Sequence, residues 1–140
     1  MLKGVPKELP PELLGLLAEM GHGDEIVVVD ANYPAYSAGP PVVAVPGVDA
    51  PTMVAAILKL MPLDTFVEEN VFLMDSGNEE KPEIWQDFHQ VLEESGEDAR
   101  TAPIDRFDFY ERAQNAYAIV ATGEGRPYGC VILKKGVIFF

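Results

Sequence analysis

The sequence has few residues with which to bind a metal or form disulfides. Among its 140 residues there are one cysteine, Cys130, and two histidines, His22 and His89. A single cysteine excludes an intrachain disulfide and a cysteine-rich metal site. The two histidines are far apart and lack a histidine–carboxylate helix motif. We therefore expect neither a metal nor a cofactor.

Positive charge is also scarce. Ten Lys and Arg residues face 23 Asp and Glu residues, for a formal net charge of -13. Such a surface repels nucleic-acid phosphates and anionic lipids, whereas an uncharged sugar meets no electrostatic penalty. No apolar run approaches the roughly 18 residues that a membrane helix needs. The start, Met1–Pro6, lacks the apolar core of a signal peptide. We expect a cytoplasmic protein that contacts neither nucleic acid nor membrane.

Hydrophobic residues, in contrast, are plentiful. They make up 48% of the chain, and the mean hydropathy is +0.05. This length suits one domain with a real core. The high hydropathy favours apolar surface that is buried between subunits, so we expect a homo-oligomer.

Helical and strand patterns alternate along the chain. The periodicity predicts helices over 12–20, 50–61, 82–94 and 107–115. It predicts strands over 25–30, 42–45, 71–74, 117–122, 130–133 and 137–140, with loops over 31–41, 75–82 and 97–104. We expect one α/β domain over 1–140, a three-layer α/β/α sandwich with a mixed sheet.

Two polar residues flank the first predicted strand. His22 lies between two glycines just past a helix, and its ordinary pKa of about 6.5 suits proton transfer. The alternative is a histidine that complements the negative end of that helix. Asp30 ends the strand, where ligands of open α/β sheets gather. It can equally cap the following turn.

Two further candidates lie near the C-terminal end. Arg106 can hold a hydroxyl-rich ligand or pair with one of many surface carboxylates. Tyr128, at the start of a strand, can hydrogen-bond a ligand or be an ordinary half-buried tyrosine. The loop 32–37 offers amide, hydroxyl and aromatic groups that suit sugar recognition, and also suit a surface loop.

Several segments together resemble the ribose pyranase / fucose mutarotase family (RbsD/FucU-like). They are Glu19–Ile26, Asp30–Pro34, Arg106–Gln114 and Ala118–Glu124 followed by Tyr128-Gly129. They occur in the family's order over nearly the whole chain. The segment at Arg106 looks like the fucose branch, which favours L-fucose over D-ribose.

The resemblance implies roles for individual residues. It makes His22 the proton donor and places Asp30, Arg106 and Tyr128 at substrate-contacting positions. Asp64 and Tyr110 match positions that contact sugar in some fucose members. Cys130 departs from the family, which usually has Asn there, and a thiol is a weaker hydrogen-bonding group than an amide. Family members form ring-shaped oligomers, often decamers of two pentamers, with sites near subunit boundaries.

These observations lead to one expected activity. We expect a mutarotase that interconverts the α and β anomers of a free monosaccharide, most simply L-fucose, by general acid–base ring opening. In this hypothesis His22 exchanges protons with the sugar, and Asp30 also holds the His22 ring. Two alternatives remain: a pyranase that interconverts the pyranose and furanose forms of D-ribose, and a non-catalytic sugar-binding accessory of uptake.

Overall fold

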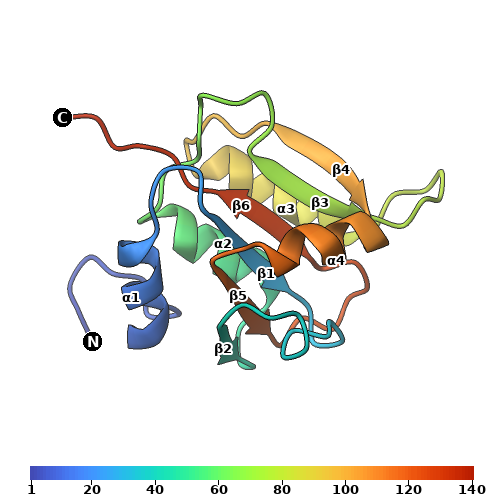
Figure 1. Ribbon diagram of the computed structural model, residues 1–140, viewed down its shortest axis with the longest axis horizontal. Helices are drawn as coiled ribbons and strands as arrows, with labels where there is room; N and C mark the ends of the chain where they lie inside the picture. Colours follow the sequence, from blue (N-terminus) through green and yellow to red (C-terminus); the bar gives the residue numbers. More distant parts are fainter.

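One mixed sheet of six strands forms the centre of the computed structural model, which describes residues 1–140 (Figure 1). The strands are β1 (Glu25–Val29), β2 (Val42–Val45), β3 (Val71–Asp75), β4 (Thr101–Asp105), β5 (Ala118–Thr122) and β6 (Val131–Lys134). Their spatial order is β2-β5-β1-β6-β3-β4. Strand β6 is antiparallel to β1 and β3, and every other pairing is parallel. The carboxyl ends of β1 to β5 therefore lie at one edge of the sheet.

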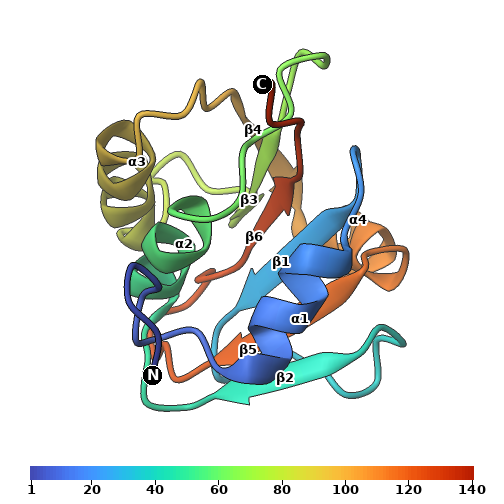
Figure 2. The same ribbon diagram turned by 90° about the vertical axis from the view of Figure 1, so that its left-hand side faces the viewer.

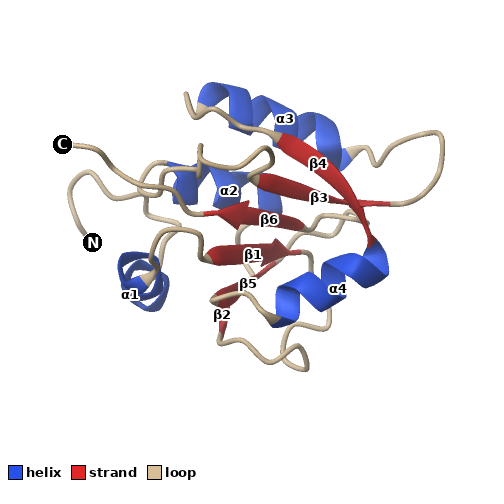
Figure 3. Ribbon diagram, turned by 45° about the horizontal axis from the view of Figure 1, so that its top comes forward, coloured by secondary structure: helices blue, strands red, loops and turns tan.

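Four helices cover the two faces of this sheet. They are α1 (Pro11–Glu19), α2 (Ala50–Leu58), α3 (Ile84–Glu94) and α4 (Arg106–Gln114). Helices α1, α2 and α3 share a hydrophobic core on one face, and α4 packs on the other (Figures 2 and 3). The predicted three-layer α/β/α sandwich with a mixed sheet is thus confirmed. None of the helices is both long and apolar enough to cross a lipid bilayer.

Strand β1 shows why the sheet needs two covering layers. Its residues Ile26 to Val29 are all buried, as expected for a strand that is hydrophobic on both faces. Ile26 and Val28 belong to the core beneath α1, α2 and α3, whereas Val27 and Val29 belong to the core beneath α4. Because successive side chains point to opposite faces, this apolar run contributes side chains to both hydrophobic cores.

Two helices begin at aspartates that cap them. The carboxylate of Asp49 accepts the N–H of Thr52 at 2.8 Å, and that of Asp105 accepts the N–H of Asp108 at 2.9 Å. Such caps satisfy backbone donors that have no partner within the helix. Since Asp105 also ends β4, α4 starts directly at the edge of the sheet and places Arg106 there.

Two predictions of secondary structure are wrong. The range 97–104 was predicted as a loop, yet β4 forms over Thr101–Asp105. Its Pro103 is tolerated because β4 is an edge strand, where one unpaired N–H faces outward. The range 137–140 was predicted as a strand, yet it is irregular, because the pairing around β6 ends at the bridge between Leu63 and Lys135. Helix α3 also begins two residues later than predicted, at Ile84.

Candidate functional site

Polar side chains gather where the parallel strands end. Asp30 follows β1, Asp75 ends β3 and Arg106 follows β4, while Cys130 directly precedes the antiparallel β6. Ligands of open α/β sheets bind beyond the carboxyl ends of strands. We name this rim the carboxyl edge. It carries Asp30, Arg106, Tyr110, Tyr128 and Cys130, five of the seven residues predicted from the sequence.

Asp30 joins two loops of the carboxyl edge. Its Oδ1 accepts the N–H of Asn32 at 3.0 Å, and its Oδ2 accepts the N–H of Gly129 at 3.2 Å. The side chain is 8% exposed. Asp30 therefore caps the following turn, as the alternative interpretation required, and also holds the loop that carries Tyr128. A carboxylate accepts about four hydrogen bonds, so two backbone donors leave it capacity for a ligand hydroxyl.

Tyr128 and Cys130 flank the glycine that binds Asp30. Tyr128 has a φ of 59°, the left-handed region that non-glycine residues rarely adopt. Gly129 has no room for a side chain, because a Cβ there would lie 2.8 Å from Cγ of Glu124. Cys130 is buried, with Sγ 3.5 Å from Oδ2 of Asp30. Burial, followed by the nearby charge of Asp30, raises the pKa of this thiol well above its usual value.

Helix α4 contributes a cation among aromatic rings. The guanidinium of Arg106 lies 4.7 Å from the ring of Phe107 and 5.9 Å from the ring of Tyr110. The ring of Tyr110 lies 5.3 Å from that of Tyr33, which comes from the loop after Asp30. Burial raises the pKa of Tyr33, and the neighbouring Cys130 and Tyr110 add to the effect. This cluster combines phenol hydroxyl groups with a cation at the carboxyl edge, a combination suited to a polyhydroxylated ligand.

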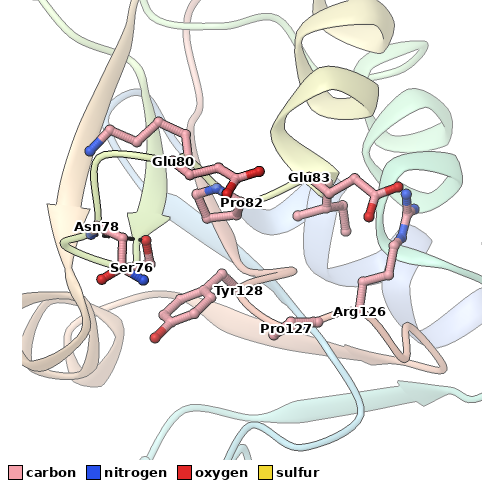
Figure 4. Close-up of a pocket in the computed structure, with 10 residues that line it drawn as sticks. Ser76, Asn78, Glu80, Pro82, Glu83, Arg126, Pro127 and Tyr128 are labelled. Carbon is pink, nitrogen blue, oxygen red and sulfur yellow. Dashed lines mark hydrogen bonds between the residues drawn. The ribbon is translucent and has the colours of Figure 1, made fainter.

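A cavity of about 470 Å³ adjoins Tyr128 on the side of α3 (Figure 4). Its walls are Ser76, Asn78, Glu80, Lys81, Pro82, Glu83, Ile84, Arg126, Pro127 and Tyr128. Arg126 and Tyr128 come from the same loop, and their side chains point to different sides of Pro127 (Figure 4). Arg126 is not among the residues predicted from the sequence. No local pattern indicates it, because its ion pair with Asp87 of α3 joins residues 39 apart.

His22 and Asp64 form a pair at the opposite edge, before β1 begins. Nε2 of His22 lies 3.0 Å from Oδ1 of Asp64, which also accepts the N–H of Phe66 at 3.0 Å. The imidazole is 44% exposed, whereas the carboxylate is buried. Burial by itself raises the pKa of Asp64, but the bonds from Phe66 and His22 and the charges of His22 and Lys134 lower it overall.

This pairing sets the tautomer of His22. Because Asp64 is ionised, Nε2 carries the proton in their hydrogen bond, and Nδ1 of the neutral ring is an acceptor. No side chain or backbone group of the chain engages Nδ1. An exposed imidazole oriented by a buried carboxylate can take up a proton and give it back. No three His, Cys, Asp or Glu side chains are grouped so that they could hold a metal ion.

The seven predicted residues therefore fall into two groups, one at each end of β1. The five residues of β1 alone, at about 3.3 Å each, separate the groups by roughly 16 Å. The expectation that Asp30 holds the His22 ring is wrong for residues of one chain, because Asp64 holds it. Asp64 was named only through the family resemblance, and its contact with His22 spans 42 residues of sequence.

Known proteins share both the sequence and the fold. The model of the RbsD / FucU transport protein family matches residues 3–138. A fucose mutarotase of Danio rerio is 47% identical, over 99% of this chain and 95% of its own. A fucose mutarotase of Streptococcus pneumoniae, solved with L-fucose, is 47% identical with a TM-score of 0.92, over 99% of this chain and all of its own. Bacillus subtilis RbsD, solved with D-ribose, is 27% identical with a TM-score of 0.75, over 99% of this chain and all of its own.

Proposed function

Since the chain belongs to the RbsD / FucU transport protein family, we propose that it is a mutarotase that interconverts the α and β anomers of L-fucose. The observation that carries this proposal is the imidazole of His22, exposed and oriented by the buried Asp64. Relatives named fucose mutarotase, at 41% to 47% identity over nearly the whole chain, support the sugar and the reaction. Residues 1–140 form one mutarotase domain.

The reaction is an isomerisation that needs proton transfer alone. The ring oxygen of the sugar receives a proton, the anomeric hydroxyl loses one, and the C1–O5 bond breaks to give the aldehyde. Rotation about the C1–C2 bond and closure yield the other anomer. The imidazolium of His22, which Asp64 stabilises, donates the proton from Nδ1 to the ring oxygen, and a water molecule accepts the proton of the anomeric hydroxyl. On closure these two transfers run in reverse and restore the imidazolium. A positioned acid–base group contributes about 10²- to 10⁴-fold, which is sufficient because the uncatalysed reaction proceeds in water.

The remaining predicted residues bind the sugar at the carboxyl edge. Asp30, Arg106, Tyr110 and Tyr128 fix its hydroxyl groups, since carboxylate, guanidinium and phenol supply both acceptors and donors. Cys130 is buried behind Asp30 and supports that carboxylate. The departure from the family's Asn at this position therefore changes the support of Asp30.

A second copy of the chain completes the site. His22 and Asp30 lie at opposite edges of the sheet, too far apart to touch one monosaccharide. A contact between the His22 edge of one protomer and the carboxyl edge of its neighbour brings them together. Such a contact joins two different surfaces and generates a ring when it closes. A homo-oligomeric ring, a decamer in the form that the resemblance implies, fits this requirement.

Nuclear magnetic resonance tests the activity directly. Magnetisation exchange between the α and β anomers of L-fucose is measured with wild type, His22→Ala and His89→Ala. His89 is the matched control, because it is the other histidine of the chain and lies exposed on α3. We expect exchange to fall to the uncatalysed rate for His22→Ala and to stay unchanged for His89→Ala. Equal exchange by wild type and His22→Ala would exclude His22 as the catalyst.

Two functions compete with this proposal: a pyranase that acts on D-ribose, and an uptake accessory that binds a sugar without catalysis. Exchange between the pyranose and furanose forms of D-ribose, measured in the same way, tests the pyranase alternative. The closer match to the fucose mutarotase than to RbsD favours fucose. An uptake accessory would bind fucose without accelerating exchange. We further propose a cytoplasmic location, in which the free thiol of Cys130 stays reduced.

A further inference from the structure

Two exposed aromatic rings lie beside the catalytic pair. The ring of Phe66 lies 5.2 Å from the imidazole of His22, and the ring of Phe139 contacts Phe66 edge-on at 6.1 Å. Phe66 is 65% exposed and Phe139 is 72% exposed. In Figure 1 the C-terminal segment with Phe139 leaves the sheet on the side of the connection between α1 and β1, where His22 lies. Clustered exposed apolar side chains indicate a binding surface.

The backbone of Phe66 is held by the catalytic pair itself. Its backbone N–H donates to Oδ1 of Asp64, the same oxygen that bonds His22. The backbone that carries the phenyl ring is therefore anchored two residues from the buried carboxylate, beside the imidazole. Any molecule whose reacting atom meets His22 also approaches this ring.

The chemistry of the sugar identifies the part that meets Phe66. In the pyranose form the ring oxygen is bonded to C1 and to C5, and in a 6-deoxy aldose C5 carries a methyl group. The methyl carbon is therefore two bonds from the oxygen that receives the proton of His22. With a hydrogen bond of about 3 Å to that oxygen, the methyl group lies within roughly 5 to 6 Å of the donating nitrogen. The centroid of the Phe66 ring lies 5.2 Å from the centroid of the imidazole, so a methyl group directed to that side of His22 contacts the phenyl ring.

We propose that Phe66, backed by Phe139, is a specificity-determining residue that binds the C5 methyl group of the sugar. The proposal rests on the proposed function, in particular on proton transfer at the ring oxygen. The aromatic pair buries the methyl group and leaves the C5 substituent no hydrogen-bonding partner, so it selects a 6-deoxy sugar over its hydroxymethyl counterpart. One buried methyl group in an apolar pocket is worth about 10- to 200-fold in specificity.

Three sugars of identical ring stereochemistry distinguish an effect on the methyl contact from an effect on the catalysed reaction. D-Arabinose carries hydrogen at C5, L-fucose a methyl group and L-galactose a hydroxymethyl group. For each, kcat/KM of anomer exchange is measured with wild type, Phe66→Ala and Phe140→Ala. Phe140 is the matched control, an exposed phenylalanine of the same tail outside the aromatic cluster. We expect Phe66→Ala to lower the preference for L-fucose over D-arabinose by about tenfold or more, and Phe140→Ala to preserve it.

The outcomes distinguish this inference from the proposed function. If wild type accelerates the exchange of no sugar in the series, the proposed function fails. If wild type is active and Phe66→Ala lowers L-fucose and D-arabinose by the same factor, Phe66 is a structural or subunit contact and the inference is overturned. Sedimentation velocity shows whether Phe66→Ala still assembles. If it does not assemble, Phe139→Ala is measured in its place. We expect a smaller loss of the preference for L-fucose over D-arabinose, and an unchanged preference would overturn the inference.

Discussion

Asp64 is the residue that holds the imidazole of His22, the proposed acid–base catalyst. It is buried, and one of its oxygens bonds both the imidazole of His22 and the backbone of Phe66. The lowered pKa keeps this carboxylate ionised near neutrality, so it fixes the tautomer of His22 and favours the imidazolium of the reaction. Loss of the Asp64 charge should therefore impair the reaction and change the acid stability of the fold.

Asp64→Asn should make the free energy of unfolding less dependent on pH under acidic conditions. Because the folded-state pKa lies below the unfolded value of about 3.9, the charge stabilises the fold above that value, and its contribution disappears as the pH falls through the lowered pKa. We expect wild type to exceed Asp64→Asn in free energy of unfolding at pH 7, with the difference shrinking below about pH 4. Urea unfolding from pH 3 to 7 measures it, and a difference independent of pH would contradict it.

Cys130 should be unreactive in the folded protein. Burial comes first among the causes that raise the pKa of its thiol, and the thiolate is the reactive form. We expect negligible alkylation by iodoacetamide at pH 8 under native conditions and full alkylation in denaturant, read by mass spectrometry. Fast native labelling would show that the loop around Asp30 opens.

The loop from β5 to β6 is the element that presents Tyr128. It is braced by Glu124, whose buried carboxylate accepts the N–H of Ala50 at 3.3 Å and of Arg126 at 3.1 Å. The guanidinium of Arg126 folds back onto Glu124 at 3.1 Å and reaches Asp87 of α3 at 2.6 Å. Backbone in the left-handed region is retained at functional sites when the surroundings enforce it. The ion pairs of Arg126 supply that enforcement for Tyr128.

Arg126→Ala should lower anomer exchange through Tyr128. A displacement of about 1 Å in a positioning group reduces rates by up to about 10²-fold, so we expect a loss of 10- to 100-fold. Arg126→Lys keeps the charge without the forked geometry and should show an intermediate loss. In a Tyr128→Phe background the further effect of Arg126→Ala should be small. A loss of equal size in both backgrounds would mean that Arg126 acts independently of Tyr128.

At the scale of the whole molecule, the sheet separates the two halves of the chemistry. In the proposed function the His22 edge supplies the acid–base pair, and the carboxyl edge supplies Asp30, Arg106, Tyr110 and Tyr128. One strand length lies between them, so in the proposed function a single chain presents two incomplete sites. We therefore propose that the activity requires assembly, and the apolar tail and high mean hydropathy agree with subunit contacts.

Mixed oligomers should recover activity from two inactive variants. In a random mixture of His22→Ala and Asp30→Asn protomers, about one site in four combines an intact His22 edge with an intact carboxyl edge. We expect co-expressed variants to reach roughly a quarter of wild-type exchange, and each variant alone to be inactive. A mixture of His22→Ala and Asp64→Asn is the control, since both changes damage the same edge and should give no recovery. No recovery in the first mixture would place both residues in one chain's site.

Much of the architecture could be predicted from local patterns. The apolar run Ile26–Val29 required a strand covered on both faces, and the alternation of elements indicated the α/β sandwich. Strand β4 could not be predicted, because Pro103 contradicts a strand unless the strand lies at an edge of the sheet. The segment Val137–Phe140 has strand-forming residues but no neighbour with which to pair. Local patterns carry no information on which strands are neighbours.

The sequence by itself determined the layers of the fold, the family and the candidate residues, because periodicity and motifs are properties of neighbours along the chain. Only the tertiary structure decided how those residues are grouped. It paired His22 with Asp64, placed Asp30 beside Gly129 and Cys130, and set Phe66 against the imidazole. The reason is geometric: these contacts join residues up to about a hundred positions apart, and sheet order and strand direction alone determine at which edge each residue lies.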